Sequence, residues 1–320
     1  MRMALRLAAA GFGVKKAALM QILFTGQNGS GAWAMRGMQI AATRPGWRAI
    51  ADASDADMIG VDAVVIVKRC APETLAAVRR RGVPVIYDPL DFWRQKGYMG
   101  WMPHAVSRVR DPAAACALVA AQIAQVAPDL LLCPTRAMAE DLAPLGWPVA
   151  VHYHHFDPRL TAANPGLGSG RPTVMFHGRP SFLKEWHPIA QIACRLAGAR
   201  FVVHGGHPPP PCDAMLAVRG GFYGNWLARR WKSNVKAATA ARLGVPLIAW
   251  PENAYLETAP DAFWFTSPRG LAQAVVQALE APRPTPELDR FSAAWSADQL
   301  AKLIAPLLET RRIAVSQRVA

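Results

Sequence analysis

The chain has 320 residues, which is more than one domain usually holds, so two domains of about 150 residues each are expected. Apolar residues make up 52% of the chain and charged residues 18%, a balance that supplies a sizeable core and excludes a disordered protein. The formal net charge of +14 indicates anionic partners, such as nucleotide phosphates, nucleic acid or an acidic membrane surface.

The five cysteines are widely spaced and form no CxxC pair, so we expect buried thiols in a reducing compartment rather than disulfides or a zinc site. Residues 1–19 have a basic start and a short apolar stretch, but Lys15 and Lys16 follow at once and no small-residue cleavage pattern stands out. We interpret them as an amphipathic extension or as the product of a start codon placed too early, with Met20 opening the first strand. The longest uncharged stretch, Pro112–Pro128, is too short to span a membrane. The expected location is the cytoplasm.

Short apolar runs alternate with helix-like segments through the first half of the chain. The expected strands are Met20–Thr25, Ala63–Val67, Val83–Tyr87, Leu130–Cys133 and Val149–Tyr153, and the expected helices include Pro72–Arg81 and Ala113–Ala127. Continuous apolar strands joined by crossover helices predict a parallel sheet covered on both faces.

The alternation breaks at Thr161–Pro172, where Gly, Pro, Ser and Asn occur without apolar periodicity, as is typical of a linker. It then resumes with expected strands at Thr173–Phe176, Arg200–His204, Met215–Val218, Pro246–Trp250 and Ala262–Phe265. The pattern therefore predicts two α/β domains, residues 1–160 and 173–320, joined by a linker over 161–172.

The expected strand ending at Phe176 is followed by Gly178, Arg179 and Lys184. Ligands of an open parallel sheet bind at the carboxyl ends of its strands, where a glycine lets the backbone approach them. Arg supplies a planar fork of donors and Lys a point charge, so the pair suits a diphosphate. The alternative is a pair of ordinary surface cations after a strand.

A second candidate is the expected helix that begins at Ser233 or Asn234 and ends at Gly244. A helix start presents free N–H groups and a partial positive charge to an anion, and Lys232 adds a full charge. A routine capped helix explains Ser233 but not the lysine before the cap, which opposes the helix dipole by about 0.3–1 kcal/mol. A bound phosphate would offset that penalty.

Three further stretches carry recognisable motifs: PENAYLE at Pro251–Glu257, GQNGSGAWAMRG at Gly26–Gly37 and IYDPLDFW at Ile86–Trp93. Together with His177–Arg179, Lys184 and Lys232–Pro246, they resemble glycosyltransferases of the GT-B fold, particularly bacterial enzymes akin to the glycogen-synthase-like group. The resemblance covers most of the chain, from about Met20 to Leu279. It implies two Rossmann-like, doubly wound parallel-sheet domains that face a cleft, with a terminal helix at Ala297–Leu308 packing back on the first domain.

The same resemblance implies transfer of a sugar from a nucleoside-diphosphate sugar to an unknown glycan, lipid-linked or protein acceptor, with a cell-envelope or other surface glycan as the expected class. The residues that would hold the donor are Gly178, Arg179, Lys184, Lys232, Ser233, Asn234, Thr239 and Glu257 of the second domain, with Gly29 and Gly31 of the first. We expect neither a cofactor nor a metal, since no convincing carboxylate cluster is present.

One departure from the family pattern bears on catalysis. Many retaining members carry two glutamates eight positions apart on the donor helix, and the corresponding residues here are Trp231 and Thr239, neither of which can ionise. A divergent active enzyme is the preferred interpretation, because the cations for the diphosphate are present. A non-catalytic protein that binds sugar nucleotides or assembles glycans is the alternative, and neither retaining nor inverting chemistry is assigned.

On the acceptor side, Asp88 and Asp91 follow an expected strand, and either would orient or deprotonate an acceptor hydroxyl. The alternative is that they turn the chain or cap a helix. The HYHHFDP stretch contains His152, His154, His155 and Asp157. Strand alternation separates its histidines onto two faces, so an interdomain loop near the cleft is preferred to a metal site.

Two other classes of function fit less well. A dinucleotide-dependent oxidoreductase would use GQNGSG, but the glycine spacing departs from GxGxxG. A nucleic-acid binder would use the positive charge, yet no basic stripe interleaved with aromatic residues is present, so no nucleic acid is expected. The charge, with Trp47, Trp93 and Trp101, is also consistent with peripheral contact on an anionic membrane, at its inner face.

Overall fold

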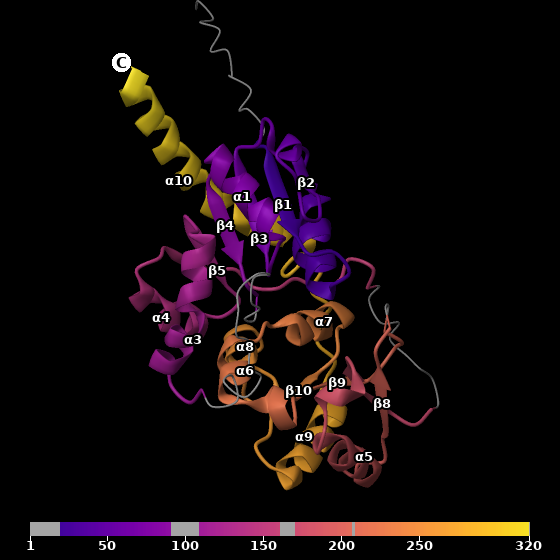
Figure 1. Cartoon of the computed structure of the whole chain (residues 1–320). Helices are drawn as coiled ribbons and strands as arrows, with labels where there is room; N and C mark the ends of the chain where they lie inside the picture. The colour runs from indigo at the N-terminus through magenta and orange to yellow at the C-terminus, as the bar shows by residue number, and fades with distance from the viewer. Residues whose placement is uncertain (1–19, 91–108, 161–169, 207–208, 320) are drawn as a thin grey trace, which may run out of the picture.

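The computed structural model describes residues 20–90, 109–160, 170–206 and 209–319. These residues form two α/β domains, and the sheet of each contains only parallel strands (Figure 1). The predicted fold class is therefore confirmed. Most of the predicted linker, residues 161–169, lies outside the described residues, as do Asp91, Trp93 and Trp101.

The first sheet has six strands in the order β2-β1-β3-β4-β5-β6. They are β1 (Ile22–Gly26), β2 (Trp47–Ala49), β3 (Ala63–Val67), β4 (Val85–Asp88), β5 (Leu130–Cys133) and β6 (Val149–Val151). Four central strands are buried along their whole length, which explains their continuous apolar sequences. The sequence did not predict β2, because its three residues at the sheet edge carry no strand pattern of their own.

Helices cover both faces of this sheet. They are η1, a π-helix (Trp33–Gln39), η2 (Ala56–Met58), α1 (Pro72–Arg81), α3 (Pro112–Val126), α4 (Arg136–Leu142) and η3 (Ala143–Leu145). The predicted helix Pro72–Arg81 has the bounds of α1, which ends at Gly82 in the left-handed conformation. Asp111 caps α3 by accepting a hydrogen bond from the N–H of Ala114.

The second sheet has five strands in the order β11-β10-β9-β7-β8. They are β7 (Thr173–His177), β8 (Arg200–His204), β9 (Ala214–Ala217), β10 (Leu247–Ala249) and β11 (Phe263–Trp264). The surrounding helices are η4 (Pro180–Phe182), α5 (Trp186–Leu196), η5 (Gly221–Gly224), α6 (Trp226–Trp231), α7 (Val235–Leu243), α8 (Asn253–Thr258) and α9 (Pro268–Glu280). Each expected strand of this half lies within about two residues of an observed one.

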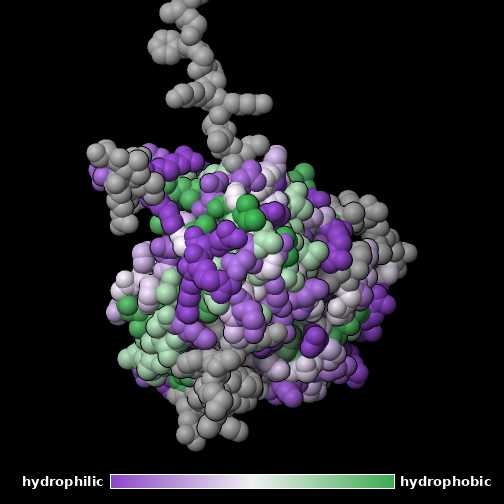
Figure 2. All heavy atoms as spheres, turned by 45° about the horizontal axis from the view of Figure 1, so that its top comes forward, coloured by the Kyte–Doolittle hydropathy of each residue, from purple (hydrophilic) through white to green (hydrophobic). Residues whose placement is uncertain are grey.

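The last helix, α10 (Ala293–Val319), returns from the second domain to the first (Figure 1). Its residues Leu300 and Ile304 are buried in the same core cluster as Ile22 and Phe24 of β1. The outer surface here is mostly hydrophilic, with only small separate apolar groups, as the forward face in Figure 2 shows. None of the helices in the described ranges combines the length and hydrophobicity that a membrane span requires.

Candidate functional site

The strand order of the second sheet brings three sequence-distant residues to one edge. Gly178 follows β7, Arg219 follows β9 and Glu252 follows β10, and these three strands are neighbours in the sheet. The carboxyl edge of a parallel sheet is where open α/β domains bind their ligands. We refer to Gly178, Arg219, Lys236 and Glu252 as the strand-end cluster.

Gly178 makes room for a lysine. Its φ is +149°, and a β-carbon built on it would lie 3.1 Å from the Phe176 ring and 3.3 Å from the amine of Lys236. A side chain at this position would therefore displace that amine. From the sequence we expected that this glycine lets a ligand approach the backbone. In the structure, the amine of Lys236 lies beside it.

Lys236 lies in the first turn of α7. It was not predicted from the sequence as a site residue, and neither were Arg219 and Glu252. Its amine donates a hydrogen bond to the carbonyl oxygen of His177 and lies 4.1 Å from the centre of the Phe176 ring. Burial lowers the pKa of Lys236 to about 7, and the charge of Arg219 adds to this effect. The one sequence feature that could have pointed to Lys236 is its place as the second lysine of KSNVK, at a helix start where a cation is unfavourable.

Arg219 and Glu252 form an ion pair in which both side chains are largely buried. The guanidinium of Arg219 also lies 5.9 Å from the centre of the Tyr255 ring. Burial raises the pKa of the Tyr255 hydroxyl, so this group stays neutral. The cluster thus contains two basic side chains and one carboxylate. Because Glu252 pairs with Arg219, the charge of the cluster depends on the protonation of Lys236.

Arg179 and Lys184 lie on the turn that follows β7, and both are exposed. Neither side chain forms a hydrogen bond or an ion pair with a residue that the structure describes. Two hydrogen bonds join the turn to the loop after β9. The N–H of Gly220 donates to the carbonyl oxygen of Phe182, and the N–H of Gly221 donates to the carboxylate of Glu185. Lys184 therefore lies beside the segment that carries Arg219, as the 3.1 Å separation between its Cγ and a β-carbon built on Gly221 also shows.

The start of α7 differs from the predicted open helix end. Ser233 and Asn234 are buried, and the side chain of Asn234 does not cap the helix. Its Oδ1 instead accepts a hydrogen bond of 2.7 Å from the backbone N–H of His154, in the segment that leaves the first domain. Lys232 ends α6 and is half-buried. The helix start therefore contacts the interdomain segment.

Two of the predicted donor-binding residues lie elsewhere. Thr239 is buried and its hydroxyl donates to the carbonyl oxygen of Val235 within α7, so it presents no free group to a ligand. Glu257 reaches across to the first domain, where it accepts hydrogen bonds from the N–H of Arg136 at 2.8 Å and from the hydroxyl of Tyr153 at 3.0 Å. In the structure, a helix-internal bond involves the Thr239 hydroxyl, and an interdomain contact involves the Glu257 carboxylate. Their assignment to the donor stays a prediction.

A second interdomain contact surrounds Asp141 of α4. Its carboxylate accepts hydrogen bonds from the guanidinium of Arg230 and from the indole N–H of Trp231, at 2.7–2.9 Å. Trp231, one of the two positions where the family pattern places a glutamate, is therefore a buried interdomain residue. These contacts hold the carboxyl edge of the second sheet against the first domain.

Asp88 at the end of β4 is almost fully buried, and both of its carboxylate oxygens accept hydrogen bonds. The stronger partner is Arg36 of η1, whose Nε lies 2.7 Å from Oδ2 of Asp88. Arg36 also contacts the ring of His152 and the carbonyl oxygen of Tyr153. Asp88 is thus the counter-ion of a buried arginine. Its role toward an acceptor hydroxyl stays a prediction.

The histidines of the interdomain segment form separate hydrogen bonds. The ring of His152 contacts Arg36 and Ser296, and that of His155 contacts Gln39. Burial holds the pKa of His152 and of His155 well below the ordinary value, so both rings are neutral. Within the described ranges, no three His, Cys, Asp or Glu side chains are grouped in a way that would hold a metal ion.

Gly29 and Gly31 lie in the exposed turn after β1. Gly29 has a φ of +79°, and a β-carbon built on either glycine would meet nothing within 4 Å. The turn is therefore open, as an approaching ligand requires.

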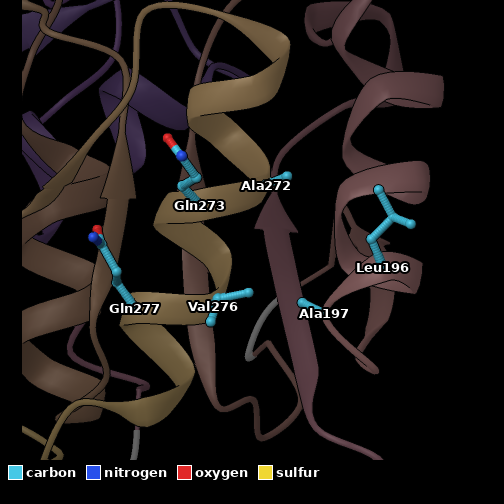
Figure 3. A pocket seen from close by; sticks show the side chains of 6 residues that line it. All are labelled: Leu196, Ala197, Ala272, Gln273, Val276 and Gln277. Atoms are coloured by element: carbon cyan, nitrogen blue, oxygen red, sulfur yellow. The ribbon is translucent and has the colours of Figure 1, made fainter.

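A groove between α5 and α9 has a different character. It is lined by Leu196 and Ala197 of α5 and by Ala272, Gln273, Val276 and Gln277 of α9, with no charged residue (Figure 3). Leu196 and Ala197 precede β8, so the groove lies towards the amino edge of the sheet, opposite Gly178. It lacks the charge that a phosphate site needs.

Neither a protein-family model nor a curated protein sequence matches the chain. Among solved structures, the glycotransferase of kitacinnamycin is similar to it, with 14% identity, a TM-score of 0.43, and coverage of 88% of this chain and 94% of that one. A UDP-GlcNAc 2-epimerase from Neisseria meningitidis bound to UDP-GlcNAc has 9% identity, a TM-score of 0.46, and coverage of 89% and 99%. The lipopolysaccharide outer core galactosyltransferase WaaB has 9% identity, a TM-score of 0.41, and coverage of 90% and 100%. The function proposed below rests on the residues of the chain itself.

Proposed function

We propose that the protein is a glycosyltransferase that moves a sugar from a nucleoside-diphosphate sugar to an acceptor. The observation that carries this proposal is the convergence of Lys236 and Arg219 at the carboxyl edge of the second sheet, with Lys184 on the adjoining turn. Gly178 leaves the space that brings the amine of Lys236 to the end of β7. A group of cations at this edge is suited to two linked phosphates.

The same cations supply a mechanism. When the bond between the sugar and the diphosphate breaks, negative charge develops on the leaving phosphate. Preorganised positive groups stabilise that charge, and removal of one such donor commonly costs about 3–4 kcal/mol of transition-state stabilisation. Lys236, Arg219, Arg179 and Lys184 would act on the diphosphate, while Lys232 and the backbone at Ser233 and Asn234 would border it. No step of this proposal uses a metal ion.

A second candidate function is donor binding without turnover. Many retaining glycosyltransferases carry a glutamate at each of two positions that are Trp231 and Thr239 in this chain. Both residues are buried and neither can ionise, which favours binding without catalysis. The carboxylate in the strand-end cluster belongs to Glu252, and it is paired with Arg219. Turnover measured beside donor binding separates the two candidates.

On the acceptor side, we propose Asp91 as the residue that orients or deprotonates the acceptor hydroxyl, with Asp88 as the counter-ion that positions Arg36 and the interdomain segment. The open turn at Gly29 and Gly31 would approach the donor or the acceptor from the first domain. The acceptor class is a cell-envelope or other surface glycan.

We propose a cytoplasmic location, because all five cysteines are thiols in the folded chain, which suits a reducing compartment. The formal net charge of +14 supports contact with the inner face of an anionic membrane. Binding to vesicles of phosphatidylglycerol at low salt tests that contact.

The experiment that tests the function is a thermal-shift panel of nucleoside diphosphates and their sugars, followed by a hydrolysis and transfer assay with those that bind. A ligand at one hundred times its Kd should stabilise the folded state by about 2.7 kcal/mol. In the double variant Arg179→Ala, Lys184→Ala we expect loss of that stabilisation and of turnover. The matched control is Arg195→Ala, Arg200→Ala, which removes two exposed cations near the start of β8, at the opposite edge of the same sheet. Equal activity in the two double variants would exclude the proposed site.

A further inference from the structure

A cavity separate from the strand-end cluster lies where the chain crosses between the domains. Its volume is about 250 Å³, and it is lined by Arg136, Val151, Tyr153, Trp295, Gln299 and Lys302, among others. Arg136 begins α4, Val151 and Tyr153 belong to β6 and the segment after it, and the last three belong to α10. We refer to it as the crossing cavity.

The fold leaves this space for a simple reason. β6 is the edge strand of the first sheet, so no further strand covers its outer side. α10 packs across one face of this sheet and reaches Ala150 of β6 at its edge. Trp295, Gln299 and Lys302 follow one another at spacings of four and three residues, which places them on one face of the helix. That helix face and the end of β6 form opposite walls of the cavity.

The charge of the crossing cavity is positive. The cations Arg136 and Lys302 line it, and none of the other described residues that line it is Asp or Glu. His152, which also lines it, is neutral, since burial and the neighbouring Arg36 hold its pKa well below the ordinary value. Lys302 is exposed, and within the described part of the chain it forms no ion pair or hydrogen bond. The carboxylate of Glu257 accepts bonds from the Tyr153 hydroxyl and from the backbone N–H of Arg136, so it lies beside the cavity and offsets one of the two positive charges. A net positive charge remains.

Two aromatic rings, those of Tyr153 and Trp295, line the cavity beside these cations, and the buried ring of Phe291 packs against both. The ring centres of Tyr153 and Phe291 are 6.4 Å apart and those of Phe291 and Trp295 are 5.3 Å apart, both in edge-to-face geometry. An apolar wall with a few polar groups is typical of sites for organic ligands, and such sites usually have volumes of about 300–1,000 Å³. At about 250 Å³, the crossing cavity suits a ligand with one ring.

We propose that the crossing cavity is a binding site for a small phosphate ester carried on a single ring, such as a monosaccharide phosphate. Arg136 and Lys302 would hold the phosphate, the amide of Gln299 would bond to a ring substituent, and the ring would pack on Trp295. The ligand would contact the first domain, the crossing segment and α10 together. This proposal does not depend on the sugar-transfer function, because none of its residues belongs to the strand-end cluster.

The test is calorimetric titration of the full chain with glucose 6-phosphate and with phenyl phosphate, in the presence of saturating UDP. We expect at least one of the two esters to bind, and glucose and inorganic phosphate to bind much more weakly. Lys302→Ala and Arg136→Ala should each raise the Kd by about tenfold or more, as for loss of a charged hydrogen bond. Arg311→Ala removes an exposed cation nine residues farther along α10 and should leave the Kd unchanged.

Three results would overturn the proposal: no binding of either ester, displacement of the bound ester by UDP, or an unchanged Kd in both cavity variants. Binding that persists in the Arg179→Ala, Lys184→Ala variant is expected, and it would distinguish this site from the donor site. Circular dichroism of each variant checks the fold. Lys302→Gln, which keeps the length of an exposed side chain, serves if the alanine variant does not fold.

Discussion

The amine of Lys236 lies 3.3 Å from the point that a β-carbon on Gly178 would occupy. Gly178 follows β7, and Lys236 belongs to the first turn of α7. Because Gly178 has no side chain, the amine of Lys236 can lie at this position. Because the carbonyl oxygen of His177 accepts a hydrogen bond from the same amine, the lysine is held at the strand end. An anion that binds at this edge therefore meets an amine that is already positioned to bind it.

Gly178→Ala should therefore weaken binding of the donor. The added methyl group would move the amine of Lys236, and we expect the Kd for UDP to rise about tenfold, a loss of about 1.4 kcal/mol. The matched control is Gly198→Ala, in which φ is +68° and the new β-carbon meets nothing within 4 Å. Both variants should lose about 1 kcal/mol or more of stability through backbone strain, but only the first should lose affinity. Calorimetric titration with UDP checks this.

The titration of Lys236 should couple ligand binding to proton uptake. The pKa of this amine is about 7 in the folded protein, against an ordinary value of 10.5, so much of it is uncharged at neutral and alkaline pH. A bound diphosphate stabilises the ammonium form, so binding above pH 7 should take up a proton, and the affinity should fall as the pH rises. Calorimetry in buffers with different ionisation enthalpies measures the uptake. In Lys236→Met we expect none, and uptake that persists there would assign the proton to another group.

The same shift predicts how stability depends on pH. Between about pH 7 and pH 10.5, the unfolded chain holds a proton on Lys236 that the folded chain has lost. The free energy of unfolding should therefore rise with pH in this window by up to about 1.4 kcal/mol per pH unit from this group. Urea unfolding at a series of pH values measures the slope. The slope in Lys236→Met should be smaller than that in the unchanged protein.

Asp88→Asn should lower the free energy of unfolding, and this should be its main effect. The substitution leaves the buried guanidinium of Arg36 without its counter-ion, which commonly costs about 3–5 kcal/mol. The double variant Arg36→Met, Asp88→Leu removes both charges and should recover most of that loss. Urea unfolding of the three proteins checks the prediction. A single variant as stable as the unchanged protein, but without transferase activity, would instead support Asp88 as a catalytic base.

Glu257→Gln should loosen the contact between the domains. The carboxylate accepts two hydrogen bonds from the start of α4 and one from Tyr153, and a neutral amide accepts such bonds more weakly. We expect faster hydrogen exchange at the amides of Arg136 and Ala137. Glu280→Gln, at an exposed acid on α9, is the control. Equal exchange at α4 in both variants would show that Glu257 does not hold the domains together.

Most strands were predictable because they carry continuous apolar runs, which burial on both faces explains for β1, β3, β4 and β5. β8 is a half-buried edge strand, but it carries an apolar run as well. β3, β5 and β8 have the bounds expected from their apolar runs, and α1 has those expected from its proline at the start and glycine at the end. β2 was not predictable, since three residues at a sheet edge carry too little pattern. α10 is longer than its expected core, because its last turns extend past the residues that pack on the sheet.

The candidate site was predictable only in part. Gly178, Arg179 and Lys184 follow a strand directly, so their place at a sheet edge follows from local sequence. Thr239 and Glu257 were assigned to the donor by their place in a family pattern, and their observed hydrogen bonds serve the helix and the domain contact instead. A pattern gives the position of a residue along the chain, but not the direction of its side chain.

Two features follow from the sequence alone: the chain forms two parallel α/β domains, and a glycine and two cations follow the first strand of the second domain. Both could be predicted because apolar periodicity and turn residues act over short distances along the chain. Only the tertiary structure decided that Lys236, 59 positions after His177, lies at that strand end, and that Arg219 and Glu252 join it. The physical reason is that strand order and helix packing bring these residues together, and burial in that setting, rather than residue type, sets the charge of the lysine.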